Sequence, residues 1–82
     1  MICHIYRSER KAGAYLFLPE KDRFDHLPGQ LRKLVGQLTW VMALDLSEDR
    51  PLAQADVAEV RRLLREDGYY LQLPPGDWIQ GA

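Results

Sequence analysis

Side chains suited to catalysis or metal binding are few in this chain, and most are far from one another in the sequence. Cys3, the only cysteine, adjoins His4, but a catalytic thiol needs a base within hydrogen-bond reach, and neighbours on a strand point to opposite faces. Asp22, Asp25 and His26 form one close group of metal-binding residue types, in a charged connection that we expect to be a solvated loop. Cys3 is therefore expected to be a small buried hydrophobe, and we predict no metal and no cofactor.

Two pairs of neighbouring carboxylates, Glu48 with Asp49 and Glu66 with Asp67, would suit acid and base catalysis only if one member were partly buried. The first pair falls in an expected turn and the second at an expected helix end, so both pairs should be solvated. The sequence contains no glycine-rich phosphate loop and no serine nucleophile elbow. We therefore predict a protein that is not an enzyme, with no catalytic residues.

Charge is distributed unevenly along the chain. Residues 1–41 carry seven basic and four acidic side chains, a net charge of +3, whereas residues 42–82 carry four and eight, a net charge of −4. If the tip of the first hairpin and the first helix lie on the same side, five basic residues would form one patch: Arg7, Arg10, Lys11, Arg32 and Lys33. Such a patch would contact RNA phosphates, and direct RNA binding is the alternative function.

A second candidate surface lies near the end of the chain, at Tyr70, Pro74, Pro75 and Trp78. Partner proteins use surfaces of this kind because rigid amphipathic rings bury area at a low entropic cost. Tyr69 and Tyr70 would lie on opposite faces of a strand, so at least one of the two is expected in the core. The leading prediction is a module that docks an unknown protein partner on an exposed face around Tyr70.

Six helices and strands are expected to carry these residues. Strands are expected over residues 1–6, 14–18, 38–46 and 69–73, and helices over 27–35 and 56–67. Arg7 is expected to begin the turn after the first strand, and Leu34 to belong to the apolar stripe of the first helix, which Gly36 ends. Asp56 and Glu59 have the spacing of a capping box at the start of the second helix, and Gly68 ends it.

The apolar run from Trp40 to Leu44 would be buried on both faces of a strand, which predicts the central strand of the sheet. The order strand, strand, helix, strand, helix, strand predicts an α/β (α+β) two-layer sandwich, with about four strands and both helices on one face. The chain of 82 residues suffices for one core. The run is far shorter than the roughly 20 apolar residues that span a bilayer, so a soluble cytoplasmic protein with no membrane contact is expected.

Three groups of residues resemble the YcgL domain family of small bacterial proteins. They are Cys3, Ile5, Tyr6, Arg7 and Ser8 at the start, Ala55-Asp56-Val57 in the centre, and the closing run Gly68-Tyr69-Tyr70-Leu71-Gln72-Leu73-Pro74-Pro75. The closing run is the most specific of the three.

The resemblance implies a YcgL-like domain over residues 1–75, a short tail over 76–82, and a small α/β sandwich in the bacterial cytoplasm. It implies no assigned biochemical role. Because such proteins are sometimes encoded beside ribonuclease D, it also suggests an association with a ribonuclease or with RNA metabolism. Relatives continue past the double proline with a polar segment, whereas only seven residues follow Pro75 in this chain.

Overall fold

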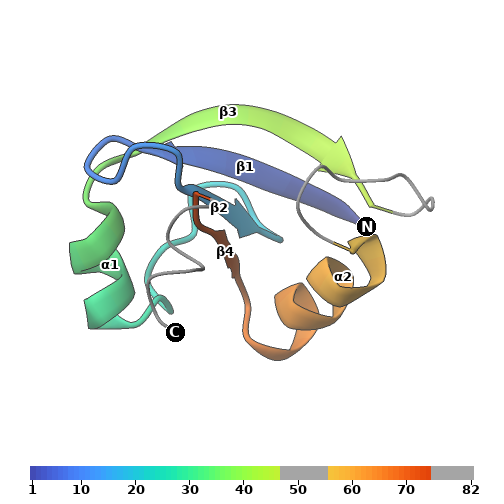
Figure 1. Cartoon of the computed structure of the whole chain (residues 1–82). Helices are drawn as coiled ribbons and strands as arrows, with labels where there is room; N and C mark the ends of the chain where they lie inside the picture. Colours follow the sequence, from blue (N-terminus) through green and yellow to red (C-terminus); the bar gives the residue numbers. More distant parts are fainter. Residues whose placement is uncertain (47–55, 75–82) are drawn as a thin grey trace, which may run out of the picture.

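The computed structural model describes residues 1–46 and 56–74 of the chain. Within them, one antiparallel sheet and two helices form a small α+β domain (Figure 1). Along the chain the elements are β1 (Ile2–Ser8), β2 (Tyr15–Leu18), α1 (Gly29–Val35), β3 (Leu38–Asp45), α2 (Val57–Glu66) and β4 (Tyr70–Gln72). The expected turn at 47–50 and the expected tail at 76–82 lie outside the described residues.

The first strand is longer than expected. Arg7 does not begin a turn, because β1 continues to Ser8, which is paired with Leu38 of β3. The Ser8 N–H also donates a hydrogen bond to the Ala14 carbonyl oxygen at 3.0 Å, which closes the connection to β2. Backbone pairing on both sides therefore keeps this polar segment extended despite its charge.

The strand expected at the centre of the sheet lies at its edge. The strand order is β3-β1-β2-β4, so β1 and β2 are central and the prediction for residues 38–46 is wrong in this respect. Trp40, Val41 and Met42 are 42%, 43% and 43% exposed. The pairing shifts between Ile5–Met42 and Tyr6–Trp40, which leaves Val41 as an extra residue without a partner on β1. An apolar run alone does not distinguish a covered strand from an exposed one.

The two helices cover opposite faces of the sheet, so the prediction of a two-layer sandwich with both helices on one face is wrong. On β2, Leu16 packs in a cluster with Val35 of α1, whereas its neighbour Phe17 packs in a cluster with Val60 of α2. Successive strand residues point to opposite faces. Figure 1 shows α1 and α2 on either side of β2 and β4. The buried strand that requires a cover on each face is β2, not β3.

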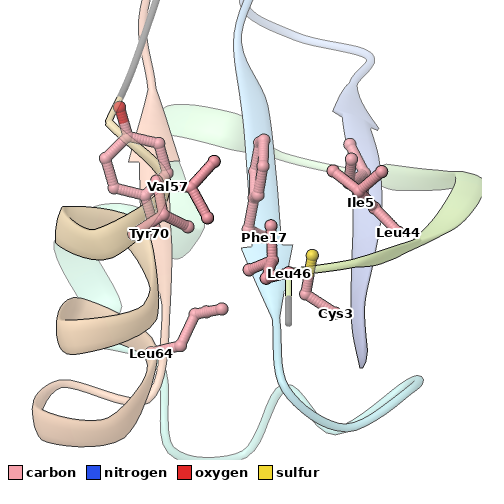
Figure 2. Close-up of a cluster of buried hydrophobic side chains, with 9 residues drawn as sticks. Cys3, Ile5, Phe17, Leu44, Leu46, Val57, Leu64 and Tyr70 are labelled. Carbon is pink, nitrogen blue, oxygen red and sulfur yellow. The ribbon is translucent and has the colours of Figure 1, made fainter. Parts of the chain in front are cut away.

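The cluster between the sheet and α2 is the larger of the two cores (Figure 2). Its members are Cys3, Ile5, Phe17, Leu44, Leu46, Val57, Val60, Leu64 and Tyr70. At the start of α2, the Asp56 carboxylate accepts a hydrogen bond from the Ala58 N–H at 3.0 Å. The other half of the expected capping box is absent, since Glu59 pairs with Arg62 instead. Gly68 follows the helix with a φ of +82°, as its left-handed role predicts.

The cluster between the sheet and α1 contains Tyr6, Leu16, Leu18, Leu27, Leu31 and Val35. Leu34 was expected in this stripe but is exposed. Gly36 ends α1 with a φ of +61°, as predicted. Neither described helix is long and apolar enough to cross a membrane.

We expect Leu64→Ala to lower the free energy of unfolding by about 2–5 kcal/mol, because the side chain is 2% exposed and its removal leaves a cavity under α2. The matched control is Leu34→Ala, which removes the same atoms from a side chain that is 40% exposed. The control should cost less than about half a kcal/mol beyond helix propensity. Urea titration of both variants measures the difference, and equal losses would show that the faces are assigned wrongly.

Candidate functional site

Tyr70 does not contribute to an exposed docking face. Its side chain is 9% exposed and its ring meets Phe17 edge to face, with centroids 5.3 Å apart. The two residues are paired across β2 and β4 on the side that α2 covers. Burial raises the pKa of the Tyr70 hydroxyl. The expectation of an exposed Tyr70 is therefore wrong, because the covered face of β4 is the face on which this ring lies.

Of the other residues of that predicted surface, the structure describes Pro74 alone. Pro74 is half-buried and lies against Gly13, where an added Cβ would be 3.0 Å from the Pro74 Cγ. Glycine is favoured at position 13 because its φ is +83° and because a Cβ there would press against Pro74. Pro75 and Trp78 lie outside the described residues.

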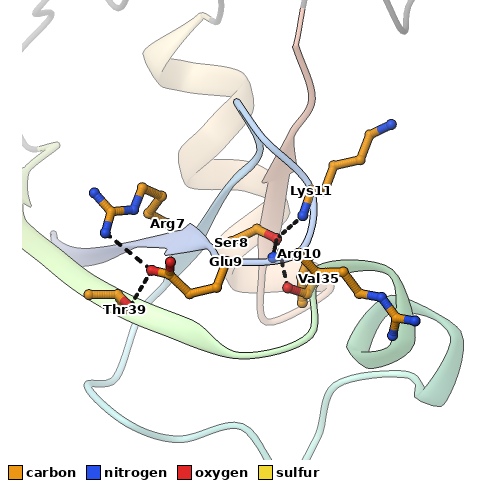
Figure 3. A network of polar contacts seen from close by, with 7 residues as sticks. All are labelled: Arg7, Ser8, Glu9, Arg10, Lys11, Val35 and Thr39. Atoms are coloured by element: carbon orange, nitrogen blue, oxygen red, sulfur yellow. Dashed lines mark hydrogen bonds and ion pairs between the residues drawn. The ribbon is translucent and has the colours of Figure 1, made fainter.

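A buried hydroxyl joins the first turn to the end of α1 (Figure 3). The Ser8 Oγ donates to the Val35 carbonyl oxygen at 2.6 Å and accepts from the N–H groups of Arg10 and Lys11 at 3.2 and 2.8 Å. The residue is 4% exposed. This role of Ser8 was not predicted from the sequence, although a serine before a charged turn is typical of local hydrogen bonds between side chain and backbone.

This link brings part of the predicted basic patch together. The Arg10 side chain crosses to the end of α1, donates to the Lys33 carbonyl oxygen at 2.9 Å, and lies against Gly36. Arg32 and Lys33 occupy the last turn of that helix. Three of the five predicted residues therefore lie at one end of α1. Figure 3 shows the Lys11 side chain pointing away from the Arg10 guanidinium.

Arg7 is held apart from this group by a carboxylate. Its guanidinium lies 3.1 Å from a Glu9 oxygen, which also accepts a hydrogen bond from the Thr39 hydroxyl at 2.6 Å. These two hydrogen bonds lower the pKa of Glu9. Arg7 thus carries a compensated charge on the β1–β3 side of the turn.

An open hollow lies beside the basic group. It has a volume of about 260 Å³ and is lined by Phe24, Leu27, Arg32, Val35, Gly36, Gln37 and Leu38. A smaller hollow of about 190 Å³ lies near the end of β2, where Glu20 and Arg23 are paired at 2.8 Å. His26 lines this second hollow, and one of its ring nitrogens is 2.8 Å from the Gly68 carbonyl oxygen.

The exposed part of β3, around Trp40, is a surface that was not predicted from the sequence. Trp40 donates from its indole nitrogen to His4 Nδ1 at 3.4 Å, and the Lys21 ammonium lies 4.6 Å from its ring centroid. Ile2 is also exposed on neighbouring β1. The sequence carries no signal for this exposure, because it depends on which strand lies beside β3.

Cys3 is fully buried, as predicted. Burial raises the pKa of its thiol to about 11, which keeps the thiol protonated at neutral pH. Tyr6 donates a hydrogen bond to Asp22 Oδ1 at 3.0 Å, so this member of the charged connection supports the fold. Among the described residues, no group of three metal-binding side chains is present.

Replacing Ser8 by Ala should lower the free energy of unfolding by about 1–3 kcal/mol, because buried backbone groups lose their hydrogen-bond partner. Thr39→Val is the control, since that hydroxyl contacts an exposed carboxylate. The control should change stability by less than about half a kcal/mol. Urea titration compares the two variants. An unchanged free energy of unfolding in Ser8→Ala would refute the structural role of the hydroxyl.

The Cys3 thiol should make stability depend on pH in the alkaline range. Its pKa is raised from 9.0 to about 11 in the fold, so the folded chain binds more protons than the unfolded chain between these values. The resulting stability is fully present below pH 9 and is lost as the pH rises toward 11. The free energy of unfolding should therefore fall more steeply between pH 9 and 11 for the natural chain than for Cys3→Ala. The variant retains every tyrosine, so the ionisation of tyrosines contributes equally to both chains. Parallel slopes would contradict the burial of the thiol.

Comparison with known proteins agrees with the residue groups at the start, centre and end of the chain. The sequence profile of the YcgL domain matches residues 3–75. A YcgL domain-containing protein of Vibrio cholerae serotype O1 is 43% identical over 75 residues, which cover 92% of this chain and 80% of that relative. The YcgL domain-containing protein of Vibrio campbellii is 45% identical over 75 residues, which cover 92% of this chain and 80% of that relative. The one of Proteus mirabilis is 41% identical over 75 residues, which cover 92% of this chain and 77% of that relative. The chain belongs to the YcgL domain family.

Proposed function

We propose that this domain is a non-catalytic module that docks a partner protein on the exposed edge of its sheet, at β3. The observation that carries the proposal is the exposure of three consecutive large apolar side chains, Trp40, Val41 and Met42. Trp40 is paired with Tyr6 on the α1 face and Met42 with Ile5 on the α2 face, so the exposed side chains lie on both faces of the strand edge. Large apolar side chains left exposed next to one another along an edge strand are a feature of surfaces that bind a partner. The proposed surface replaces Tyr70, which is buried, with Trp40 as the aromatic anchor.

The backbone of β3 supports the same function. This strand has eight residues and pairs with β1 on one side, and no strand among the described residues pairs with its outer side. Such an edge offers N–H and C=O groups to an added strand. Asp45, at its end, is the one charged residue of β3. Charged residues that usually block strand addition are therefore absent from its middle.

The surroundings of Trp40 favour a partner with an acidic residue next to its apolar contact. The Lys21 ammonium lies over the Trp40 ring, and no described carboxylate forms an ion pair with it. A partner carboxylate could meet this ammonium while an apolar group covers the Trp40 ring. Charge next to an apolar anchor would supply orientation in addition to affinity.

RNA contact is the second candidate function. It is supported by the convergence of Arg10, Arg32 and Lys33 at the end of α1. The ion pair between Arg7 and Glu9 weakens it, because one of the five expected phosphate contacts is already compensated. Binding of this kind would weaken steeply with rising salt.

A photo-crosslinking amino acid in place of Val41 should form one discrete adduct with another protein in living cells of the source bacterium. The matched probe replaces Arg65, which is exposed on α2, and should not form this adduct. The adduct should be lost when Trp40→Ala and Met42→Lys are added, because the anchor is removed and a charge is placed on the edge. Mass spectrometry identifies the adducts.

Three results would overturn docking at β3. They are the absence of an adduct at position 41, the same adducts from both probes, and an adduct that persists in the double variant. An adduct with twice the mass of the chain would instead show self-association. Both substituted side chains are more than two-fifths exposed, so the double variant should fold, and its circular dichroism spectrum and urea midpoint verify this.

A further inference from the structure

From the chemistry of its lining, we infer that the hollow at the end of α1 binds a small amphiphilic anion, namely an aromatic ring or short acyl chain that carries one carboxylate. The hollow lies among Phe24, Leu27, Arg32, Val35, Gly36, Gln37 and Leu38. This site is separate from the exposed surface of β3 around Trp40. The inference therefore goes beyond protein docking.

The floor of the hollow is apolar and firmly held. Leu27 and Val35 belong to the core cluster under α1, and Phe24 and Leu38 pack against that cluster. The Phe24 ring meets Tyr6 edge to face, with centroids 5.2 Å apart, and Tyr6 is itself fully buried. A ring or acyl chain that enters the hollow would thus contact side chains that already have fixed positions, which limits the entropic cost of binding.

The rim supplies one uncompensated positive charge. Arg7, Arg23 and Arg62 each form an ion pair with a described carboxylate. Arg32 lines the hollow, and among the described residues no carboxylate pairs with it. A guanidinium presents two parallel N–H donors that match the two oxygens of a carboxylate. The hollow therefore offers a fitting polar contact next to its apolar floor.

Neighbouring charges strengthen the preference for an anion. None of the seven lining residues is acidic. Arg10 lies against Gly36 and donates to the Lys33 carbonyl oxygen, so two further basic residues lie at the same end of α1. The second hollow lacks this character, because Glu20 already neutralises Arg23 there.

The size of the hollow favours a small ligand. Its volume of about 260 Å³ lies just below the roughly 300–1,000 Å³ of drug-sized ligand sites. Arg32 is exposed and lines this space, so a ligand whose apolar group contacts Phe24 or Leu27 can present its carboxylate to the guanidinium. A free carboxylate with one ring or a short chain fits this arrangement.

The test is a titration of the ¹⁵N-labelled full chain with 3-phenylpropionate, followed by amide chemical shifts. We expect saturable shifts centred on Gly36, Gln37 and Leu38. The uncharged 3-phenylpropionamide should bind at least about tenfold more weakly, and Arg32→Gln should weaken phenylpropionate binding by a similar factor. Arg65→Gln, which removes an exposed arginine from α2, should leave the affinity unchanged.

Several results would overturn the inference. Shifts that do not saturate or that centre elsewhere would exclude the hollow as the site. If the acid and the amide bind with equal affinity, or if Arg32→Gln binds the acid as tightly as the natural chain does, the ligand enters the hollow through apolar contact without recognition of its charge. If a single-stranded RNA oligonucleotide displaces phenylpropionate at lower concentration and shifts the same amides, the basic group serves RNA. The Trp40→Ala, Met42→Lys variant should bind as the natural chain does, which separates this test from docking at β3.

Discussion

The hydrogen bonds of the Ser8 hydroxyl hold the turn after β1 against the end of α1, where Arg10, Arg32 and Lys33 lie. One short bond reaches the last residue of α1, and two more fix the turn that follows β1. Because the hydroxyl is buried, water cannot replace these partners at low cost. Arg10 is thereby directed across Gly36 toward Lys33. The basic end of α1 and the hollow beside it depend on this constraint.

The second constraint is that β2 is apolar on both faces. Leu16 and Leu18 require a cover on one side and Phe17 on the other, so the helices must lie on opposite faces of the sheet. Two short helices then cover the centre of the sheet, and β3 is left at its edge. The exposed surface of Trp40 and Met42 is thus a consequence of how the core is closed. The exposed edge at β3 and the hollow at the end of α1 both result from placing the two helices on opposite faces of the sheet.

Local chemistry explains which expectations were correct. Asp56 caps α2 and Gly36 ends α1, because these roles depend on neighbours within a few residues in the chain. Cys3 is buried because it lies on the covered face of a central strand. Trp40 and Tyr70 were both placed wrongly, since their exposure depends on strand order and on which helix covers which face. The hollow could not be foreseen, because its lining combines a loop, a helix end and the start of β3.

The family, the approximate bounds of the elements and the residues that begin or end the helices could all be predicted from the amino-acid sequence. These features follow from residue types and short spacings, which act before distant segments meet. The order of the strands, the opposite placement of α1 and α2, and the hydrogen bond from Arg10 to the Lys33 carbonyl oxygen could be seen only in the folded chain. Those outcomes depend on contacts between segments far apart in the chain, where several arrangements bury similar apolar area and side-chain fit selects one.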